Sequence, residues 1–269
     1  MNRKVCFITA IYGNYETTCK KFIEQSEPTD FICFTDNSDI ISNGWIIDTT
    51  PYHLENKSTL DNGEFINSFS NNKHSFNIAK YYKQSFQNIP RLKQYDVIIW
   101  LDGTLEIKNP DTSKWTINKI YTYKIIGWNH EWRNGILVGE VLESRCSERY
   151  SSTFWNNQSQ PFQDVVGQYN AYIDDGFDNF YFKRIDPERK HYGVWVTCFI
   201  AFLNHDKFVT EFLNNWYLQT LKYTTQDQIG FPYVCQKMAF SPYTLPDNDV
   251  GGEEPHEKTD FYLKYAHGL

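Results

Sequence analysis

Hydrophobic residues along this chain gather in short continuous runs that are separated by polar turns. The most apolar run is VIIWL at 97–101, which has no polar face and is far shorter than the roughly 20 apolar residues that cross a membrane. Such a run is typical of a strand buried on both faces of a mainly parallel sheet. It stops at Asp102-Gly103-Thr104, and open α/β sheets place their ligand crevice at such carboxyl ends.

Three earlier runs predict the strands that accompany this one. They occupy 5–11, 31–34 and 45–48, and the first two end in small polar residues. Residues 17–25 are predicted to form the helix that crosses from the first strand to the second, and the spacing at 77–86 predicts a helix that Pro90 ends. The order of strand, helix, strand, helix, strand predicts a doubly wound α/β fold, with helices flanking a central, mainly parallel sheet.

The second part of the chain has a looser pattern. Strands are predicted at 105–107, at 123–128 and, singly or as a pair, at 193–203. Helices are predicted at 136–145, from 205 through 221, and after an N-cap within 224–228. The polar stretches 51–72 and 241–260 are predicted to be loops, and the pattern at 151–182 predicts no definite element.

Composition narrows the classes of protein that the chain can belong to. A length of 269 residues suits a single compact domain. Aromatic residues make up 17% of the chain, which favours clefts that stack on flat ligands or sugar rings. The net charge of −7 argues against a nucleic-acid partner, because phosphate contacts require a basic surface.

Cysteine usage and hydropathy predict a soluble cytoplasmic protein. The apolar stretch near the start is too short for a signal peptide, and no stretch is long enough to cross a bilayer. No CxxC pair occurs, and the scattered cysteines are predicted to be reduced: Cys6, Cys19, Cys33, Cys146, Cys198 and Cys235. The oligomeric state is not predicted by any of these patterns.

The residues at the predicted strand ends carry the candidate chemistry. Asp102 is suited to hold a divalent cation, which could in turn hold a diphosphate, and Gly103 lets the backbone turn and a ligand approach. Asp36 follows the second strand at the same edge of the sheet, and Lys80 lies on the helix before the central strand. Each has a plain structural alternative: an Asp-Gly turn, a cap, and a solvated helix face, respectively.

Six segments together resemble the DUF616-type group of GT-A glycosyltransferases. They are TAIYGNYE, FICFTDN, AKYYK, IWLDG, NHEWRNGI and DQIGFPYV, and they cover most of the chain between 5 and 234. The resemblance implies a Rossmann-like GT-A domain, with 1–110 as the nucleotide-sugar-binding half and 111–269 as the acceptor-binding half. It also implies a UDP-type donor and transfer of a sugar, hexosyl or pentosyl, to a hydroxyl of a glycan acceptor.

Site residues are carried over on the matching positions. Asp102 would begin the DxD metal motif, and His267 would complete a site for Mn²⁺ or Mg²⁺. The chain departs from the motif because its third position is Thr104. The residues expected around the donor are Thr9, Ala10, Tyr12, Asp36, Lys80, Asp102, Gly103, Thr104, His130 and Arg133.

An inverting transfer also needs a carboxylate that takes the proton of the acceptor hydroxyl. Asp227 matches the acidic residue at the head of a late helix and is the first candidate, with a helix cap as its plain alternative. Glu140 is the second, with a solvated helix face as its alternative. His130 and Arg133 have an ordinary strand-end loop as theirs, and His267 a surface position near the end of the chain.

Two other classes of function stay open at this point. One is a non-catalytic protein that binds a nucleotide sugar or glycan on the same scaffold, since a fold does not decide a function. The other is a nucleotidyltransferase of the sugar-nucleotide pyrophosphorylase kind. The loop after the first strand, IYGNYE, lacks the glycine-rich basic pattern of that class, which counts against it.

Overall fold

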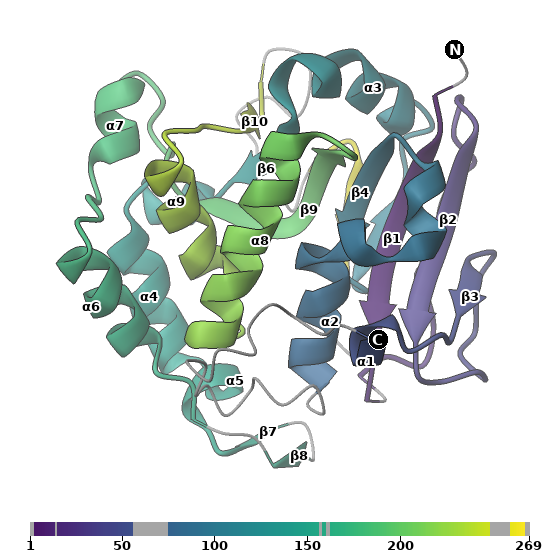
Figure 1. Cartoon of the computed structure of the whole chain (residues 1–269), viewed down its shortest axis with the longest axis horizontal. Coiled ribbons are helices and arrows are strands. Elements are labelled where there is room, and N and C mark those ends of the chain that lie inside the picture. The colour runs from purple at the N-terminus through teal and green to yellow at the C-terminus, as the bar shows by residue number, and fades with distance from the viewer. Residues whose placement is uncertain are drawn as a thin grey trace.

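A seven-stranded sheet forms the centre of the molecule, in the strand order β10-β6-β9-β4-β1-β2-β3 (Figure 1). The computed structural model describes residues 3–13, 15–55, 75–155, 158–159, 162–247 and 259–266. β9 is antiparallel to its neighbours β4 and β6, and the remaining pairs are parallel. The strands are β1 (Val5–Ile11), β2 (Thr29–Thr35), β3 (Ile46–Asp48), β4 (Val97–Leu101), β6 (Ile125–Asn129), β9 (Trp195–Leu203) and β10 (Tyr243–Leu245).

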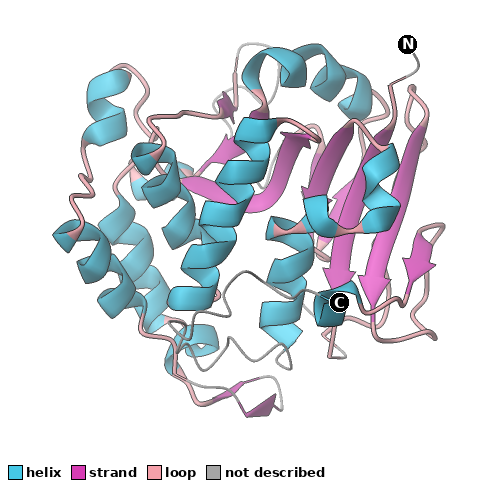
Figure 2. Cartoon of the chain, in the orientation of Figure 1, coloured by secondary structure: helices cyan, strands magenta, loops and turns pink. Residues whose placement is uncertain are grey.

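Helices flank this sheet and make up most of the molecule on the side of β6 and β9 (Figure 2). Two short two-stranded sheets complete the described fold: β5 (Leu105–Ile107) with β11 (Tyr262–Lys264), and β7 (Phe154–Trp155) with β8 (Gln158–Ser159). The helices are α1 (Tyr52–Glu55), α2 (Ser75–Gln84), α3 (Thr112–Tyr123), α4 (Leu137–Cys146), α5 (Glu148–Ser151), α6 (Val165–Asp174), α7 (Tyr181–Ile185), α8 (Lys207–Lys222) and α9 (Asp227–Lys237).

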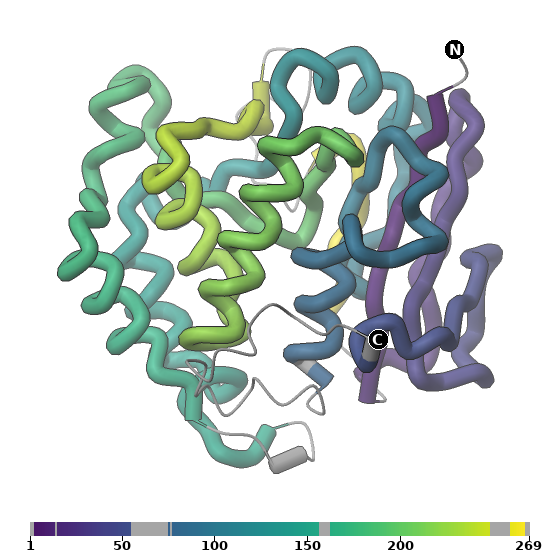
Figure 3. The backbone as a smooth tube through the Cα atoms, in the orientation of Figure 1, coloured from purple at the N-terminus to yellow at the C-terminus, as the bar shows by residue number. Residues whose placement is uncertain are grey.

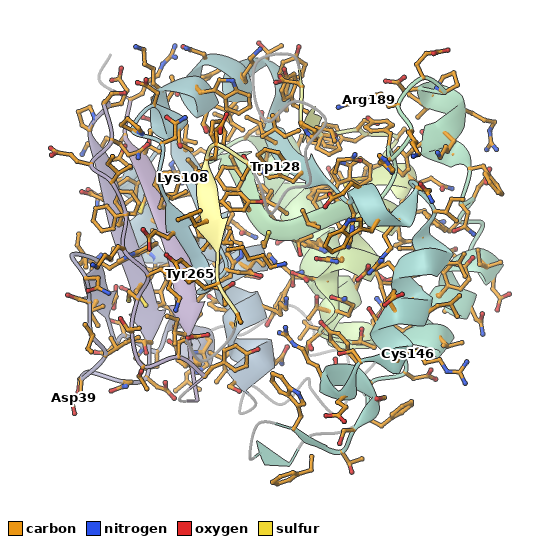
Figure 4. All side chains as sticks on the ribbon, turned by 180° about the vertical axis from the view of Figure 1, so that it is seen from behind. Asp39, Lys108, Trp128, Cys146, Arg189 and Tyr265 are labelled. Atoms are coloured by element: carbon orange, nitrogen blue, oxygen red, sulfur yellow. The ribbon has the colours of Figure 1, made fainter. Side chains whose placement is uncertain are left out.

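Both faces of the sheet are buried, as the continuous apolar runs require. Ile98 and Trp100 of β4 point to the layer that contains the apolar side chains of α2, α8 and α9. Ile99 and Leu101, which alternate with them, point to the layer of α3, β5 and β11. The view from behind shows β11 across the back of the sheet, between the labelled Lys108 and Tyr265 (Figure 4).

The order of the strands reverses between β1 and β4. The chain runs outward from β1 to β2 and β3, and then returns to place β4 on the other side of β1. In an open α/β sheet, the crevice at such a switch point, outside the carboxyl ends of the strands, is where ligands bind. The tube drawing shows that this point lies between the β1–β3 edge and the helical side that holds α4 to α7 (Figure 3).

The predicted α/β fold with a mainly parallel sheet is confirmed, and so is its arrangement as one compact domain. Each of the runs at 5–11, 31–34, 45–48, 97–101, 105–107 and 123–128 overlaps one strand, and a single strand, Trp195–Leu203, occupies most of 193–203. The helices predicted at 77–86, 136–145 and 205–221 are present as α2, α4 and α8, each within a few residues of the predicted bounds.

The helix predicted at 17–25 is wrong. The backbone there forms no helix and instead makes isolated bridges from Thr18 to Ile41 and from Phe22 to Ile107. Phe22 stacks on Phe31 with ring centroids 3.8 Å apart, so packing and backbone pairing outweigh the local helix preference. The first crossover of the doubly wound pattern therefore lacks a helix.

Other departures occur where the sequence signal is short or mixed. Pro90 does not end a helix but begins the short 3₁₀ helix Pro90–Gln94, because α2 already stops at Gln84. The three-residue strand β10 lies within the stretch predicted as a loop, and β11 and the β-branched, aromatic helix α3 were not predicted. Of the loop predicted at 51–72, residues 51–55 are described and include α1. None of the described helices is both long and apolar enough for a membrane span.

Candidate functional site

A cleft opens at the switch point, where the carboxyl ends of β1 and β4 meet the first turns of α2. Its interior volume is about 80 Å³, and it is open to solvent on one side. Gly103 helps to bring the two strand ends together, since a Cβ atom there would lie only 3.2 Å from Ile11 Cγ1. The lining residues are Ala10, Ile11, Tyr12, Tyr15, Glu16, Ser75, Ala79, Lys80, Trp100, Asp102, Gly103, Thr104 and Arg149.

Two lysines of α2 and one aspartate of α9 form a buried ionic network beside the cleft. The carboxylate of Asp227 lies 2.9 Å from Lys80 Nζ and 2.6 Å from Lys83 Nζ. Thr197 of β9 donates to Asp227 Oδ1 at 3.0 Å. Lys83 also donates to Thr197 Oγ1 at 3.0 Å, so the three elements α2, α9 and β9 share one polar cluster.

Asp102 joins this network from the end of β4. Its Oδ1 accepts a hydrogen bond from Trp100 Nε1 at 2.7 Å and lies 3.6 Å from Lys83 Nζ. The side chain is 40% exposed, whereas those of Lys83 and Asp227 are 1% and 3% exposed. Asp102 is thus the carboxylate of the network that a ligand in the cleft can reach.

The charges of this network shift one another's pKa values. Burial acts to raise the pKa of Asp227, but the ammonium groups of Lys80 and Lys83 outweigh it and hold the pKa far below the ordinary value. Asp102 shows the same balance, with burial opposed by Lys83 and Lys80, and its pKa is also lowered. Burial lowers the pKa of Lys80 to about 8, although Asp227 acts in the opposite direction. Both carboxylates are therefore ionised at neutral pH.

Aromatic rings line the other sides of the cleft. Tyr12 stacks on Tyr82 with ring centroids 5.4 Å apart, and its hydroxyl donates to Tyr82 Oη at 2.8 Å. The ring of Trp100 lies 5.5 Å from Lys83 Nζ, a distance at which the ring face stabilises the cation. The entrance thus combines rigid ring faces with charged groups, which suits a ligand that has both flat and anionic parts.

A second buried network surrounds Glu140 of α4. Arg133 Nε donates to Glu140 Oε2 at 2.6 Å, and His130 Nε2 lies 3.3 Å from the same oxygen. The other oxygen, Oε1, accepts from the side-chain amides of Gln226 and Gln228 at 2.8 and 2.9 Å. Burial acts to raise the pKa of Glu140, but the hydrogen bonds from His130 and Arg133 outweigh it, so the pKa is lowered.

The predicted site residues are distributed over the cleft, its immediate surroundings and the second network. Asp227 lies directly beside the cleft, in the lysine network. Thr9 is buried on the face of β1 that carries Phe7, and Asp36 accepts hydrogen bonds from the backbone of Gly13. The cleft itself brings together Ala10, Tyr12, Lys80, Asp102, Gly103 and Thr104.

Like Thr9, Asp36 and Asp227, the other predicted residues that the structure describes do not line the cleft. His130, Arg133 and Glu140 hold one another in the second network, which adjoins the first through α9. His267 lies outside the described residues. The roles assigned to all these residues stay predictions, because geometry places a side chain but does not test its task.

Several residues of the site were not among the predicted ones. Lys83 shares the face of α2 with Lys80, and this spacing was visible in the sequence, although burial of the ammonium was not. No local sequence pattern indicates that Thr197 of β9 or Arg149 of α5 belongs to the site. They reach the site only because distant parts of the chain are folded onto the switch point.

The predicted metal site of Asp102 and His267 stays a prediction, because His267 lies outside the described residues, and the described surroundings of Asp102 are a poor fit for a divalent cation. Among the described residues, no group of three or more His, Cys, Asp or Glu side chains is arranged to hold a metal ion. Asp102 Oδ1 already accepts from Trp100, and the ammonium of Lys83 beside it would repel a divalent cation.

Comparisons with known proteins give distant similarities. No family model matches the chain, and none of the curated proteins matches it in sequence. The solved structure of the WbbM bifunctional glycosyltransferase, in its apo form, is 10% identical with a TM-score of 0.49, over 91% of this chain and 39% of that chain. Apo mouse xyloside xylosyltransferase 1 is 9% identical with a TM-score of 0.48, over 91% of this chain and 84% of that chain. The present chain thus spans less than half the length of WbbM, and the DUF616-type grouping stays a prediction.

Proposed function

We propose that this protein is a glycosyltransferase that moves a sugar from a nucleotide-sugar donor, a UDP-sugar, to a hydroxyl of a glycan acceptor. One observation carries the proposal: a cleft at the switch point of an α/β sheet is lined by Lys80 and Asp102 and supported by Lys83 and Asp227. A switch-point crevice is where such sheets bind nucleotides. Ammonium groups placed there match a diphosphate.

The chemistry requires the bond between the anomeric carbon and the phosphate oxygen to break while negative charge grows on the leaving diphosphate. Preorganised positive charge lowers this barrier, because it stabilises the charge that develops. Lys80 lines the cleft, which supports assigning this task to its ammonium. The cleft interior of about 80 Å³ admits only the innermost part of such a donor, so the nucleoside and sugar would extend along the open side.

Asp227 was predicted as the base that takes the acceptor proton. Its contacts favour another task, since both oxygens are held by lysines and the side chain is 3% exposed. A carboxylate that is buried and paired in this way is a weak base, because protonation would break its ion pairs. We therefore propose that Asp227 positions Lys80 and Lys83, and that it favours the charged form of Lys80 by raising the pKa of that ammonium.

The exchange Asp227→Asn separates the two roles. If Asp227 is the base, the variant is expected to bind UDP as the parent does and to lose turnover. If Asp227 instead positions the lysines, UDP affinity and turnover are expected to fall together, because Lys80 and Lys83 lose their ion pairs with its carboxylate. Calorimetric titration with UDP, combined with measured rates of UDP release, distinguishes these results.

A second function is binding of the nucleotide sugar without turnover. The observation in its favour is that Asp227 and Glu140, the two acids predicted as bases, both have their oxygens occupied by neighbouring side chains. Such a protein would bind donor and never release UDP from it.

The proposed function is tested by screening UDP-sugars, with GDP- and ADP-sugars as controls. A ligand that binds only the native state raises the melting temperature, so a selective increase identifies the donor. That donor is then incubated with glycan acceptors while released UDP is measured. Release that depends on acceptor supports a transferase, binding without release supports the second function, and no binding by any nucleotide sugar contradicts both.

A further inference from the structure

The side chain of Arg149 is a further cationic group that lines the cleft. It comes from the short helix α5, whereas the lysines come from α2. Lys80 and Asp102 are lining residues as well. The cleft therefore has basic groups from both α2 and α5. An arginine there is notable because its planar guanidinium matches the paired oxygens of a phosphate group.

Three aromatic rings fix the position of this guanidinium. Its Cζ atom lies 5.6 Å from the ring centroid of Tyr150, 5.8 Å from that of Trp155 and 5.9 Å from that of Tyr15. Tyr15 is itself a lining residue, and its ring is 5.7 Å from that of Trp155. Ring faces hold a guanidinium in place, while its N–H groups can still donate hydrogen bonds in the plane of the guanidinium itself. Arg149 is thus preorganised at the cleft wall.

The charges around the cleft leave room for an anion. Lys83 and Lys80 are paired with Asp227, and Lys83 also approaches Asp102. Glu16, another lining residue, is 3.8 Å from Lys20. The lining residues alone carry two positive groups, Lys80 and Arg149, and two negative groups, Asp102 and Glu16. Together with their ion-pair partners behind the wall, there are four positive and three negative groups, so the cleft and its surroundings carry one net positive charge. A bound diphosphate would bring the compensating negative charge.

From this arrangement, we propose that Arg149 and Lys80 together bind the diphosphate of the donor nucleotide, with no bridging divalent cation. The inference rests on the proposed function and adds to it the groups that hold the leaving diphosphate. The two side chains supply the positive charge that a metal ion supplies in a DxD site. The poor fit of a cation beside Asp102 and Lys83 agrees with this assignment.

The metal-free part of the proposal is tested on the unaltered protein. After removal of metals with EDTA, calorimetric titration with UDP is expected to show binding, with a dissociation constant that changes less than about threefold when Mn²⁺ replaces EDTA. Binding should weaken as salt is added, since charged side chains hold the anion. Binding that needs Mn²⁺, or is more than about tenfold tighter with it, would overturn this inference while leaving the proposed function intact.

The role of Arg149 is tested by Arg149→Gln, with Arg149→Lys as the conservative variant. Loss of a charge-assisted contact is expected to weaken UDP binding about tenfold or more, and lysine should restore part of it. Arg145→Gln is the matched control, because Arg145 is an exposed arginine at the end of α4 and does not line the cleft. It should bind UDP as the parent does.

Uridine separates a direct contact from a general loss of structure. If Arg149 holds phosphate oxygens, Arg149→Gln should bind uridine as well as the parent does, by saturation-transfer NMR, while losing affinity for UDP. Equal loss for uridine and UDP, or none for either, would overturn the assignment of Arg149. Absence of UDP binding in the parent with and without Mn²⁺ would instead contradict the proposed UDP-sugar function itself.

Discussion

Lys83 shows at the scale of a single residue how the cleft is held together. Its side chain is 1% exposed, yet its ammonium is satisfied by Asp227 at 2.6 Å and Thr197 at 3.0 Å, and by the ring of Trp216 at 5.7 Å. Burial of an ion costs several kcal/mol, which partners of this kind offset. The network is therefore stable only when its members are all present.

The exchange Lys83→Met tests this dependence. Asp227 keeps Lys80 but loses its closest partner, at 2.6 Å, so the free energy of unfolding is expected to fall by about 3 kcal/mol. Urea unfolding followed by circular dichroism measures the change. Lys93→Met is the control, since Lys93 is exposed and its loss should cost less than about 0.5 kcal/mol. Equal stability of the two variants would show that the buried ion pair contributes little.

The pKa of Lys80 predicts how the affinity for UDP depends on pH. Its pKa of about 8 is set by burial, with Asp227 opposing and Lys83 adding to the shift, and with smaller effects from Asp102 and Arg149. An anion binds the protonated form, so affinity is highest below the pKa and falls as pH rises through it. Between pH 7 and pH 9 the protonated fraction drops about tenfold, and the dissociation constant should rise by about that factor.

Titrations with UDP at several pH values measure this effect. Lys80→Met should bind more weakly than the parent at pH 7 and lose most of the dependence. In the absence of ligand the sign is opposite: the unfolded chain binds more protons between pH 8 and 10.5, so the Lys80 contribution to stability becomes more favourable as pH rises there. A parent protein whose UDP affinity is flat from pH 7 to pH 9 would contradict the assigned role of Lys80.

At the scale of elements, the first turn of α9 joins the two buried networks. Asp227 points to the lysines of α2, whereas the flanking Gln226 and Gln228 donate to Glu140 of α4. Thr225 donates to Gln163 Oε1 at 2.7 Å, which fixes the same turn from another side. The position of Asp227 thus depends on contacts that its neighbours make in the other direction.

Glu140→Gln should therefore act at a distance on the cleft. The amide cannot accept from every donor that now faces Glu140, and Arg133 loses its anionic partner, so stability should fall by about 3 kcal/mol. The variant should also bind UDP less tightly than the parent, as titration would show. Glu143→Gln on the exposed side of α4 is the control and should change neither quantity. Loss of turnover with unchanged UDP affinity would instead favour the predicted role of Glu140 as a base.

Lowering the pH should weaken the network around Glu140. The folded-state pKa of Glu140 is lowered, so its contribution to stability is present above the ordinary pKa of 4.5 and is lost as pH falls through the folded value. Thermal unfolding between pH 7 and pH 3 should therefore depend less on pH in Glu140→Gln than in the parent. Parallel curves for the two proteins would contradict this.

At the scale of the whole molecule, the central sheet joins the two predicted halves of the chain. β4 pairs with β1 on one side and with β9 on the other, and the core layer on its α2 face includes Phe202, Phe212 and Trp216. The predicted halves 1–110 and 111–269 therefore share one sheet and one core. Neither has a complete hydrophobic layer of its own.

A fragment of residues 1–110 should accordingly fail to fold alone. It would expose β4 as an edge strand together with the apolar faces that β9 and α8 cover. Circular dichroism and denaturant unfolding of the fragment should show no cooperative transition, and adding the fragment 111–269 should restore it. A cooperative transition in 1–110 by itself would mean that the halves are separate folding units.

Much of the fold could be predicted because its signals are local. The run at 97–101 is apolar on both faces and ends at Asp102, which predicted the central strand and a cleft at its end. The helix prediction for 17–25 failed because Phe22 stacks on Phe31 and forms a bridge with Ile107, which lie in other parts of the chain. Helix propensity is weak compared with such packing.

Less of the candidate site could be predicted, because a site is made of long-range contacts. The sequence by itself determined the buried strands, the position of Asp102 at a strand end and the pairing of Lys80 with Lys83 on one helix face, since periodicity and turns are local properties. Only the tertiary structure decided that Lys83 meets Thr197, 114 residues away, and that Arg149 enters the same cleft. Burial and pairing set the charge of such groups, and both arise only when distant strands and helices pack together.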